Sequence, residues 1–253
     1  MEAYFGFYWS KNKLSFSEYA IYLKKILTSL KNTKAVVSDF KVIGTQAGER
    51  LPAGENLSEL KDSVRKSISH TDQKFTDTDE AGFITDCTLA PHGFTCHLEA
   101  HSCFNDSKIQ AKISYSDGYF GEKPVKNRLI CKFIYQENSP SAVKRLHVND
   151  SFHSLISLLS PEYARISNPD FNEAISPEQV TCIDWLTYLS HLPPDQVPAR
   201  AELLGMGISW EAVPQGGTLF MLDQEMVSAD NPEHVARGKL LRARLMEHGW
   251  IEN

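Results

Sequence analysis

The chain has 253 residues, of which 42% are hydrophobic and 23% are charged, a composition typical of a folded protein with a full core. No stretch approaches the roughly 18 consecutive apolar residues of a membrane span, and the aromatic N-terminus lacks the basic region and cleavage site of a signal peptide. We therefore expect a cytoplasmic protein. Its five cysteines, an odd number with no CxxC pair, favour buried reduced thiols over disulfides.

The net charge of −6 is distributed unevenly along the chain. Residues 170–235 contain eleven carboxylates and one base, Arg200, whereas the other 21 acids and 25 bases give the remainder a balance of +4. An acidic segment of this kind repels nucleic acid and attracts a basic protein. A solvated acidic surface without any partner is the alternative interpretation.

The first elements are predicted to be a strand, a helix and a strand. The aromatic run at residues 3–9 is typical of a strand. Residues 15–31 carry an apolar stripe at helical spacing, and Ser15 with Glu18 forms the capping-box pattern of a helix start. Residues 35–43 then predict a second strand.

The next part of the chain is expected to be mostly loop. Glycine and proline at residues 45–56 indicate a loop. Apolar spacing at residues 57–68 predicts a short amphipathic helix, and the polar stretch at 70–80 predicts a mobile surface loop.

Three strands are predicted in the middle of the chain. Residues 94–100 and 109–115 alternate between apolar and polar side chains, with a turn at 105–106 between them. A second turn is expected at Asp117-Gly118, before a more continuously apolar strand at 129–135 that is expected to be central. Because parallel strands need long crossover connections, three short consecutive strands favour an antiparallel sheet.

The C-terminal part mixes helices and strands. A helix at residues 152–159 is expected to be capped by Asp150, and residues 208–222 predict a hairpin. Residues 184–190 fit either a strand or a helix. The last helix, at 231–249, begins with the cap sequence Asn-Pro-Glu and ends at a glycine. Its predicted basic face consists of Arg237, Lys239, Arg242 and Arg244.

These elements predict an α+β fold with a mainly antiparallel sheet and helices packed against it. The chain is interpreted as one domain over residues 1–253. Two α+β halves, at about 1–140 and 150–253, remain the alternative.

Catalytic motifs are missing from the sequence, and no cofactor is predicted. One cluster, formed by His97, Glu99 and His101, shares a strand face and suggests a metal site. On a straight strand the two histidines lie roughly 13 Å apart, whereas one zinc ion needs each nitrogen within about 2.1 Å. A metal-dependent enzyme is therefore kept only as an alternative function.

Three segments occur in a distinctive order. Phe7-Tyr8-Trp9 precedes the helix at 15–30, the sequence Asp-Trp-Leu-Thr-Tyr-Leu-Ser occupies 184–190, and Asn-Pro-Glu-His-Val lies within 217–245. In their order and spacing these segments resemble the immunity protein 52 family of bacterial polymorphic-toxin systems.

The resemblance implies a non-catalytic protein that blocks a cognate toxin by steric occlusion. The toxin of such a pair is often a type VI secretion effector with a restriction-endonuclease-like nuclease domain. Neither a nucleic acid nor a membrane is expected as a partner, and an effector chaperone or adaptor is a further alternative. A nuclease presents basic residues to its phosphate substrate, so acidic residues are the candidate contacts. They are Asp195, Glu202, Glu211, Asp223, Glu225 and Asp230.

Overall fold

A computed structural model describes residues 2–10, 12–32, 39–68, 75–104, 107–119, 127–136, 145–175 and 183–251. Its strands are β1 (Glu2–Trp9), β2 (Asp39–Ile43), β3 (Arg50–Pro52), β4 (His92–Phe104), β5 (Ser107–Tyr119), β6 (Asn127–Gln136), β7 (Tyr163–Ser167), β8 (Leu186–Leu189), β9 (Ser209–Ala212) and β10 (Thr218–Met221). Its helices are α1 (Phe16–Asn32), α2 (Leu57–Ser67), α3 (Arg145–Leu159), α4 (Pro169–Ile175), the 3₁₀ turn η2 (Pro194–Gln196), α5 (Arg200–Gly205) and α6 (Pro232–Glu247).

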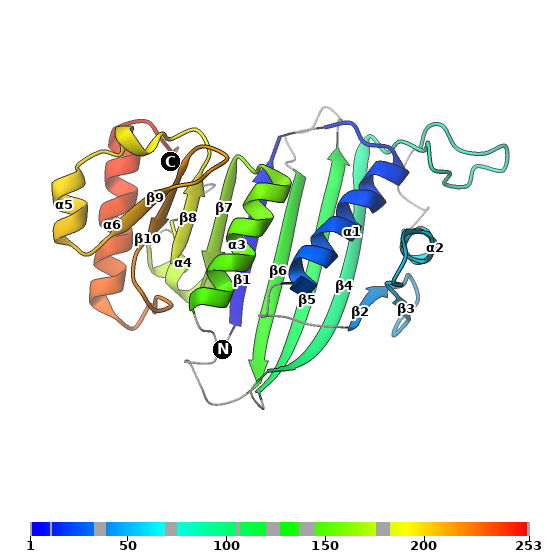
Figure 1. Cartoon of the computed structure of the whole chain (residues 1–253), viewed down its shortest axis with the longest axis horizontal. Coiled ribbons are helices and arrows are strands. Elements are labelled where there is room, and N and C mark those ends of the chain that lie inside the picture. Colours follow the sequence, from blue (N-terminus) through cyan, green and yellow to red (C-terminus); the bar gives the residue numbers. More distant parts are fainter. Residues whose placement is uncertain are drawn as a thin grey trace.

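The ten described strands form one sheet in the order β3-β2-β4-β5-β6-β1-β7-β8-β10-β9 (Figure 1). Each pairing in it is antiparallel, which confirms the predicted α+β class. The N-terminal strand β1 lies inside the sheet, between β6 and β7. Strands from both halves of the chain therefore share one hydrogen-bonded layer.

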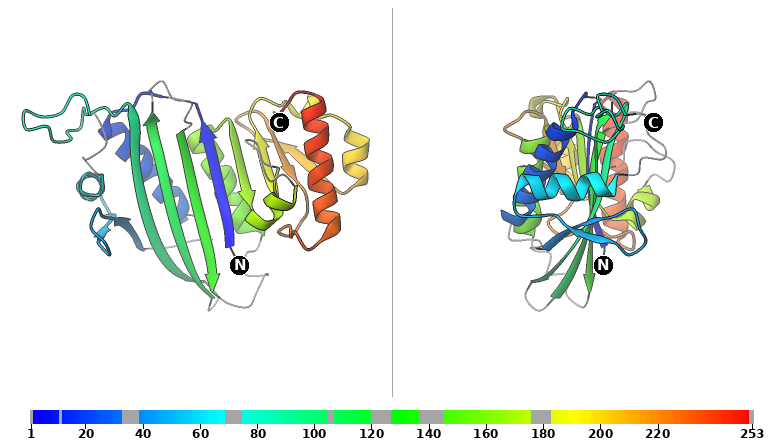
Figure 2. Two further views of the ribbon diagram at one scale, coloured as in Figure 1. Left: turned by 180° about the vertical axis from the view of Figure 1, so that it is seen from behind. Right: turned by 90° about the vertical axis from the view of Figure 1, so that its right-hand side faces the viewer.

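The helices cover the two faces of the sheet unequally. Helices α1 and α3 lie on one face, and α4 and α6 lie on the other face near β8 and β10 (Figure 2). The side chains of Phe5 and Phe7 on β1 contact Phe152 of α3, with ring centroids 6.2 and 5.1 Å apart. Tyr19 of α1 stacks on Tyr115 of β5 at 4.8 Å. Aromatic contacts thus anchor both helices on the sheet.

The predicted start of α1 is confirmed. The backbone N–H of Ser15 donates to Glu18 Oε2 at 2.8 Å, and the N–H of Glu18 donates to Ser15 Oγ at 3.3 Å. The backbone N–H and the hydroxyl of Ser15 both donate to the Glu18 carboxylate, and they hold its pKa below the ordinary value. The predicted hairpins are also confirmed, since β4 pairs with β5 up to Phe104 opposite Ser107, and β9 pairs with β10.

Three details of the prediction are wrong. Asp117 and Gly118 form no turn but continue β5, because the Asp117 carboxylate is fixed by Trp9 Nε1 at 3.2 Å and by the Tyr115 hydroxyl at 2.6 Å. The expected loop at 45–56 contains β3, which pairs with β2. Asp150 caps nothing, since α3 begins at Arg145 and Asp150 lies inside it.

Other expectations are refined. Residues 186–189 are a strand, which settles the ambiguity at 184–190. Strand β6 has neighbours on both sides, as expected of a central strand. The first residues of the second predicted strand, 35–38, and much of the loop predicted at 70–80 lie outside the described residues.

Among the cysteines, Cys96 and Cys131 are buried free thiols, while Cys87 is exposed. Burial raises the pKa of Cys96 to about 12 and also raises that of Cys131, so both remain protonated. Within the described part of the chain, no helix is both long enough and apolar enough to cross a membrane.

Candidate partner-binding surface

The six acidic residues predicted to contact a partner all lie on the elements that follow β8, from η2 to the connection between β10 and α6, at one end of the sheet (Figure 1). Five side chains are exposed and that of Asp223 is half-buried. We call this surface the acidic end. It comprises Asp195 on η2, Glu202 on α5, Glu211 on β9, Asp223 directly after β10, and Glu225 and Asp230 before α6.

Glu202 is bound by an arginine of the last helix. Arg244 donates from Nε and Nη2 to the two carboxylate oxygens at 2.7 and 2.8 Å, and from Nη1 to Glu247 at 2.9 Å. The hydrogen bond from Arg244 lowers the pKa of Glu202 and raises that of Arg244. Such a two-point contact fixes the orientation of the carboxylate, so Glu202 joins α5 to α6.

Asp223 is held even more closely. It accepts a hydrogen bond from Arg237 and from the N–H of Glu225, and His234 Nε2 lies 3.5 Å away. Burial alone would raise the pKa of Asp223, but these hydrogen bonds outweigh it and the pKa is lowered. The main-chain oxygen of the same residue accepts from Trp185 Nε1 at 3.0 Å. Asp223 therefore connects the end of β10 to α6 and β8.

The basic residues predicted to form a face of α6 are thus partly used within the protein. Arg237 and Arg244 both bind carboxylates of the acidic end. Lys239 is exposed and Arg242 is half-buried. The helix offsets part of the negative charge beside it instead of presenting a continuous basic stripe.

The remaining acidic residues are less engaged in ion pairs within the protein than Glu202 and Asp223 are. Glu211 lies 3.0 Å from His153 Nε2 of α3, at an exposed position. Asp195, Glu225 and Asp230 form no ion pair with any residue that the structure describes. The charges of these three carboxylates are therefore not offset by an ion pair within the described chain.

An apolar part of this surface was not recognised in the sequence. Leu204 is 61% exposed and Met206 is 37% exposed, both at the end of α5. On β9, half-buried Trp210 lines a cavity of about 180 Å³ with Met221. Exposed apolar side chains surrounded by charged ones are typical of protein interfaces. Helix α5 spans only Arg200–Gly205, so it shows no periodic stripe from which an exposed leucine could have been predicted.

The alternative metal cluster is not assembled in the structure. Glu99 is ion-paired with Arg50 of β3, and His101 lies opposite Asp39. Burial and the nearby Arg128 lower the pKa of His97. No three His, Cys, Asp or Glu side chains are grouped for metal binding among the residues described.

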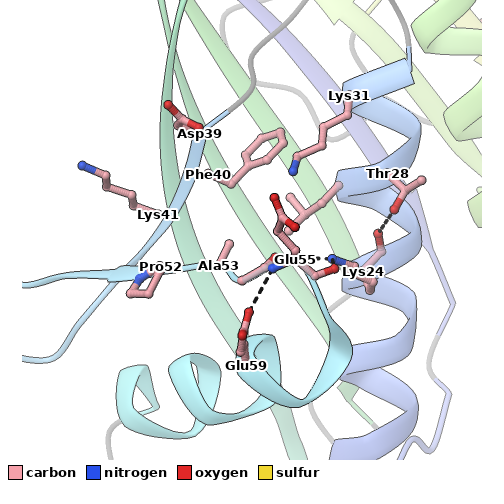
Figure 3. A pocket seen from close by; sticks show the side chains of 12 residues that line it. Lys24, Thr28, Lys31, Asp39, Phe40, Lys41, Pro52, Ala53, Glu55 and Glu59 are labelled. Carbon is pink, nitrogen blue, oxygen red and sulfur yellow. Dashed lines mark hydrogen bonds between the residues drawn. The ribbon is translucent and has the colours of Figure 1, made fainter.

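A larger pocket of about 560 Å³ lies between α1, β2 and the start of α2 (Figure 3). Lys24 donates to the carbonyl oxygens of Gly54 and Glu55, and Glu59 accepts the N–H of Glu55 at 3.1 Å. Lys31 lies 5.9 Å from the centroid of the Phe40 ring. Lys24 thus joins α1 to the segment before α2, and Lys31 joins α1 to β2.

The architecture is shared with a solved structure, the T6SS protein PA0821 of Pseudomonas aeruginosa. The superposition has a TM-score of 0.55 and covers 96% of this chain and 72% of that chain, at 10% sequence identity. At this identity the likeness concerns the α+β fold alone. No curated protein sequence matches the chain.

A narrower classification comes from the C-terminal part of the sequence. Residues 140–253 match the family described as immunity protein 52. The resemblance predicted from the sequence is confirmed over these residues, which include 184–190 and 217–245; the N-terminal segment from Phe7 to Leu30 lies outside them. The match supports an immunity role, and the entire acidic end lies within the matched part.

Proposed function

We propose that this chain is an immunity protein that binds a cognate secreted toxin and occludes its active site, without catalysis of its own. The observation that carries the proposal is the family match over residues 140–253, together with the acidic and apolar surface in the same segment. The partner that we propose is a restriction-endonuclease-like nuclease effector of a type VI secretion system, met in the cytoplasm. Neither a cofactor nor a nucleic acid or membrane partner is required.

Charge complementarity supports a basic toxin. A nuclease groove is lined with bases that bind phosphates, and a carboxylate surface both covers such a groove and accelerates encounter. Asp195, Glu225 and Asp230 would contact the toxin through charge, and Glu211, on the side of α3, would add a further carboxylate. Glu202 and Asp223, held by arginines, would contribute a fixed framework. Leu204 and Met206 supply apolar area for the centre of the contact.

The role is tested by co-expressing the chain with the toxin encoded beside it and scoring viability and co-purification. Rescue of growth with a stable complex is expected. If the cells die although the chain is folded and abundant, the immunity role is wrong. An adaptor role gives a different result, because deleting the gene then lowers toxin export without self-intoxication.

The contact surface is tested by charge reversal. We expect the double variant Asp195→Lys/Glu225→Lys to bind the toxin at least about tenfold more weakly, mainly through slower association. Both side chains are exposed and unpaired within the described chain, so the fold should be retained. Surface plasmon resonance at two salt concentrations measures both rate constants.

The matched control is Glu80→Lys/Asp150→Lys, which changes the net charge equally at exposed positions outside the acidic end. This control should bind like the unchanged chain. Equal weakening in both double variants would mean that total charge, and not the acidic end, governs association.

A further inference from the structure

A broad sheet face lies on the side opposite α1 and α3. Figure 2 shows strands β4, β5, β6 and β1 from this side, and no described helix covers them. The register places Lys112 opposite Lys132, Lys132 opposite Tyr4, and Arg128 opposite Tyr8. Directly paired residues on antiparallel strands share one face. We call this surface the basic sheet face and define it by Tyr4, Tyr8, Lys112, Ser114, Arg128 and Lys132.

Two cations of this face, Lys112 and Arg128, are not offset by an ion pair within the described chain. Both side chains are exposed. Lys112 also lies directly opposite another lysine on β6, and such like-charge pairs are unfavourable across strands. Glu99, which lies opposite Lys112 on β4, is already bound by Arg50.

Tyrosines give the face a flat aromatic part. The Tyr8 ring lies so close to Gly6 that a Cβ there would be 2.9 Å from Tyr8 Cε2, and it stacks with Tyr163 of β7 at 5.6 Å and 22°. Lys132 Nζ lies 5.1 Å from the centroid of the Tyr4 ring. Glycine at position 6 therefore allows the ring to lie flat against the sheet. Tyrosine and arginine on a flat, half-exposed surface are the residue types enriched where proteins bind each other.

We propose that the basic sheet face binds a carboxylate-rich surface of the same toxin, as a second contact separate from the acidic end. This inference rests on the proposed function. A protein partner is favoured over nucleic acid because the chain has a net charge of −6 and a long polyanion would also meet the acidic end. Carboxylates spread over a protein surface can match cations such as Lys112, Lys132 and Arg128, of which Arg128 lies roughly 13 Å from Lys132 along β6.

Together the two surfaces give the chain one acidic region and one separate basic region. Acidic residues are concentrated after β8, whereas Lys112 of β5 and Arg128 of β6 have no ion pair with a described residue. A partner with the complementary arrangement is accepted in one orientation, because rotating it would bring like charges together. The basic sheet face therefore determines which way the toxin is held.

The test is titration calorimetry of the purified toxin with the full chain and its variants. Lys112→Gln/Arg128→Glu should weaken binding by about tenfold or more. The control Lys25→Gln/Lys66→Glu removes the same charge from exposed sites on α1 and α2 and should bind within about twofold of the unchanged chain. Circular dichroism and the thermal midpoint verify that each variant folds. If Lys112→Gln/Arg128→Glu unfolds, the neutral variant Lys112→Gln/Arg128→Gln is used in its place.

Each outcome separates the two proposals. If the unchanged chain fails to bind the toxin, the proposed function is overturned and this inference with it. If the unchanged chain binds and the Lys112/Arg128 variant binds equally well, only the basic sheet face is overturned. If the unchanged chain binds poly(U) RNA and the Lys112/Arg128 variant does not, the ligand of the basic sheet face is a nucleic acid and not a carboxylate-rich protein surface.

Discussion

Asp184 is the most completely buried carboxyl group among the described residues, with no exposed surface. Its Oδ1 accepts the N–H groups of Asn168 and Trp185, each at 3.2 Å, and its Oδ2 lies 3.7 Å from Arg165 Nη1. Burial raises the pKa of Asp184 from 3.8 to about 7, and Arg165 and the two N–H groups only partly offset it. The group connects the end of β7 to the start of β8.

This carboxyl group should make stability depend on pH. Between pH 4 and pH 7 the unfolded chain has released the proton that the folded chain still holds, so raising the pH favours unfolding. The stabilisation is complete below the ordinary pKa of 3.8 and is lost as the pH rises through about 7. At about 1.4 kcal/mol per pH unit, the loss amounts to at most about 4 kcal/mol.

The measurement is urea unfolding at several pH values between 4.5 and 8. Asp184→Asn should flatten the decline in the free energy of unfolding over this range, because the amide does not titrate. Asp170→Asn changes an exposed carboxylate of α4 and should keep the original slope. Identical slopes for all three proteins would show that Asp184 is ionised in the folded state at every pH tested.

Single-residue features were predictable wherever the interacting groups are close in the sequence. Ser15 and Glu18 cap the start of α1, and Asn231 caps α6 by accepting the N–H of Glu233 at 3.0 Å. Both caps were predicted, because each depends only on residues two or three positions apart. A helix cap of this kind is therefore visible in the sequence before any tertiary contact is known.

The Asp117 prediction failed for the opposite reason. Its sequence, Asp-Gly, favours a turn locally, but its carboxylate accepts a hydrogen bond from Trp9, which is far away in the sequence. Gly93 and Gly118 both have positive φ, at 73° and 79°, on the adjacent strands β4 and β5. Glycine there lets the paired strands bend without ending. A long-range contact thus overrides the local preference.

At the scale of elements, the packing of α4 against α6 depends on one glycine. A Cβ at Gly238 would lie 2.2 Å from Ile175 Cδ1 and 3.1 Å from Phe171 Cζ, and both of these side chains are buried. We expect Gly238→Ala to lower the free energy of unfolding by about 1–3 kcal/mol, because the crowded helices must separate. Urea unfolding at fixed pH measures the change.

Gly205 provides the matched control. It lies in α5, and a Cβ there meets no atom within 4 Å. Gly205→Ala should therefore be neutral or stabilise the protein by up to about 1 kcal/mol, as helix propensity predicts. If Gly238→Ala also left the free energy of unfolding unchanged, α4 and α6 would be able to move apart without a loss of stability.

Helix α6 also explains how much of the candidate surface could be predicted from the sequence. Residue counting identified the acidic segment, and its carboxylates do lie at one end of the sheet. The sequence did not reveal that Arg237 and Arg244 bind Asp223 and Glu202, because these pairs form only after α6 packs beside α5 and β10. Tertiary packing therefore decides which of the predicted contacts keep a free charge.

For the whole molecule, the central position of β1 joins the two halves of the chain. The family match begins at residue 140, yet β7 pairs with β1, and Phe152 of α3 contacts Phe5 and Phe7. We therefore predict that the fragment 140–253 does not fold stably alone, since it loses a neighbouring strand and the aromatic partners of α3. The single-domain interpretation of residues 1–253 predicts one cooperative transition.

Two measurements test this prediction. Far-UV circular dichroism and tryptophan fluorescence of the full chain should give coincident urea transitions. The fragment 140–253 should lack a sharp transition and well-dispersed amide signals in NMR spectra. Separate transitions, or a well-folded fragment, would establish two independent α+β halves.

The position of β1 also affects the timing of biosynthesis. Tyr8 is synthesised before both of its cross-strand neighbours, Arg128 and Tyr163. At about 5–20 residues per second, the second of them is made roughly 10 to 30 seconds later. During that interval the middle of the sheet cannot close. Under the proposed immunity role, protection would therefore come from molecules whose synthesis is already complete when the toxin arrives.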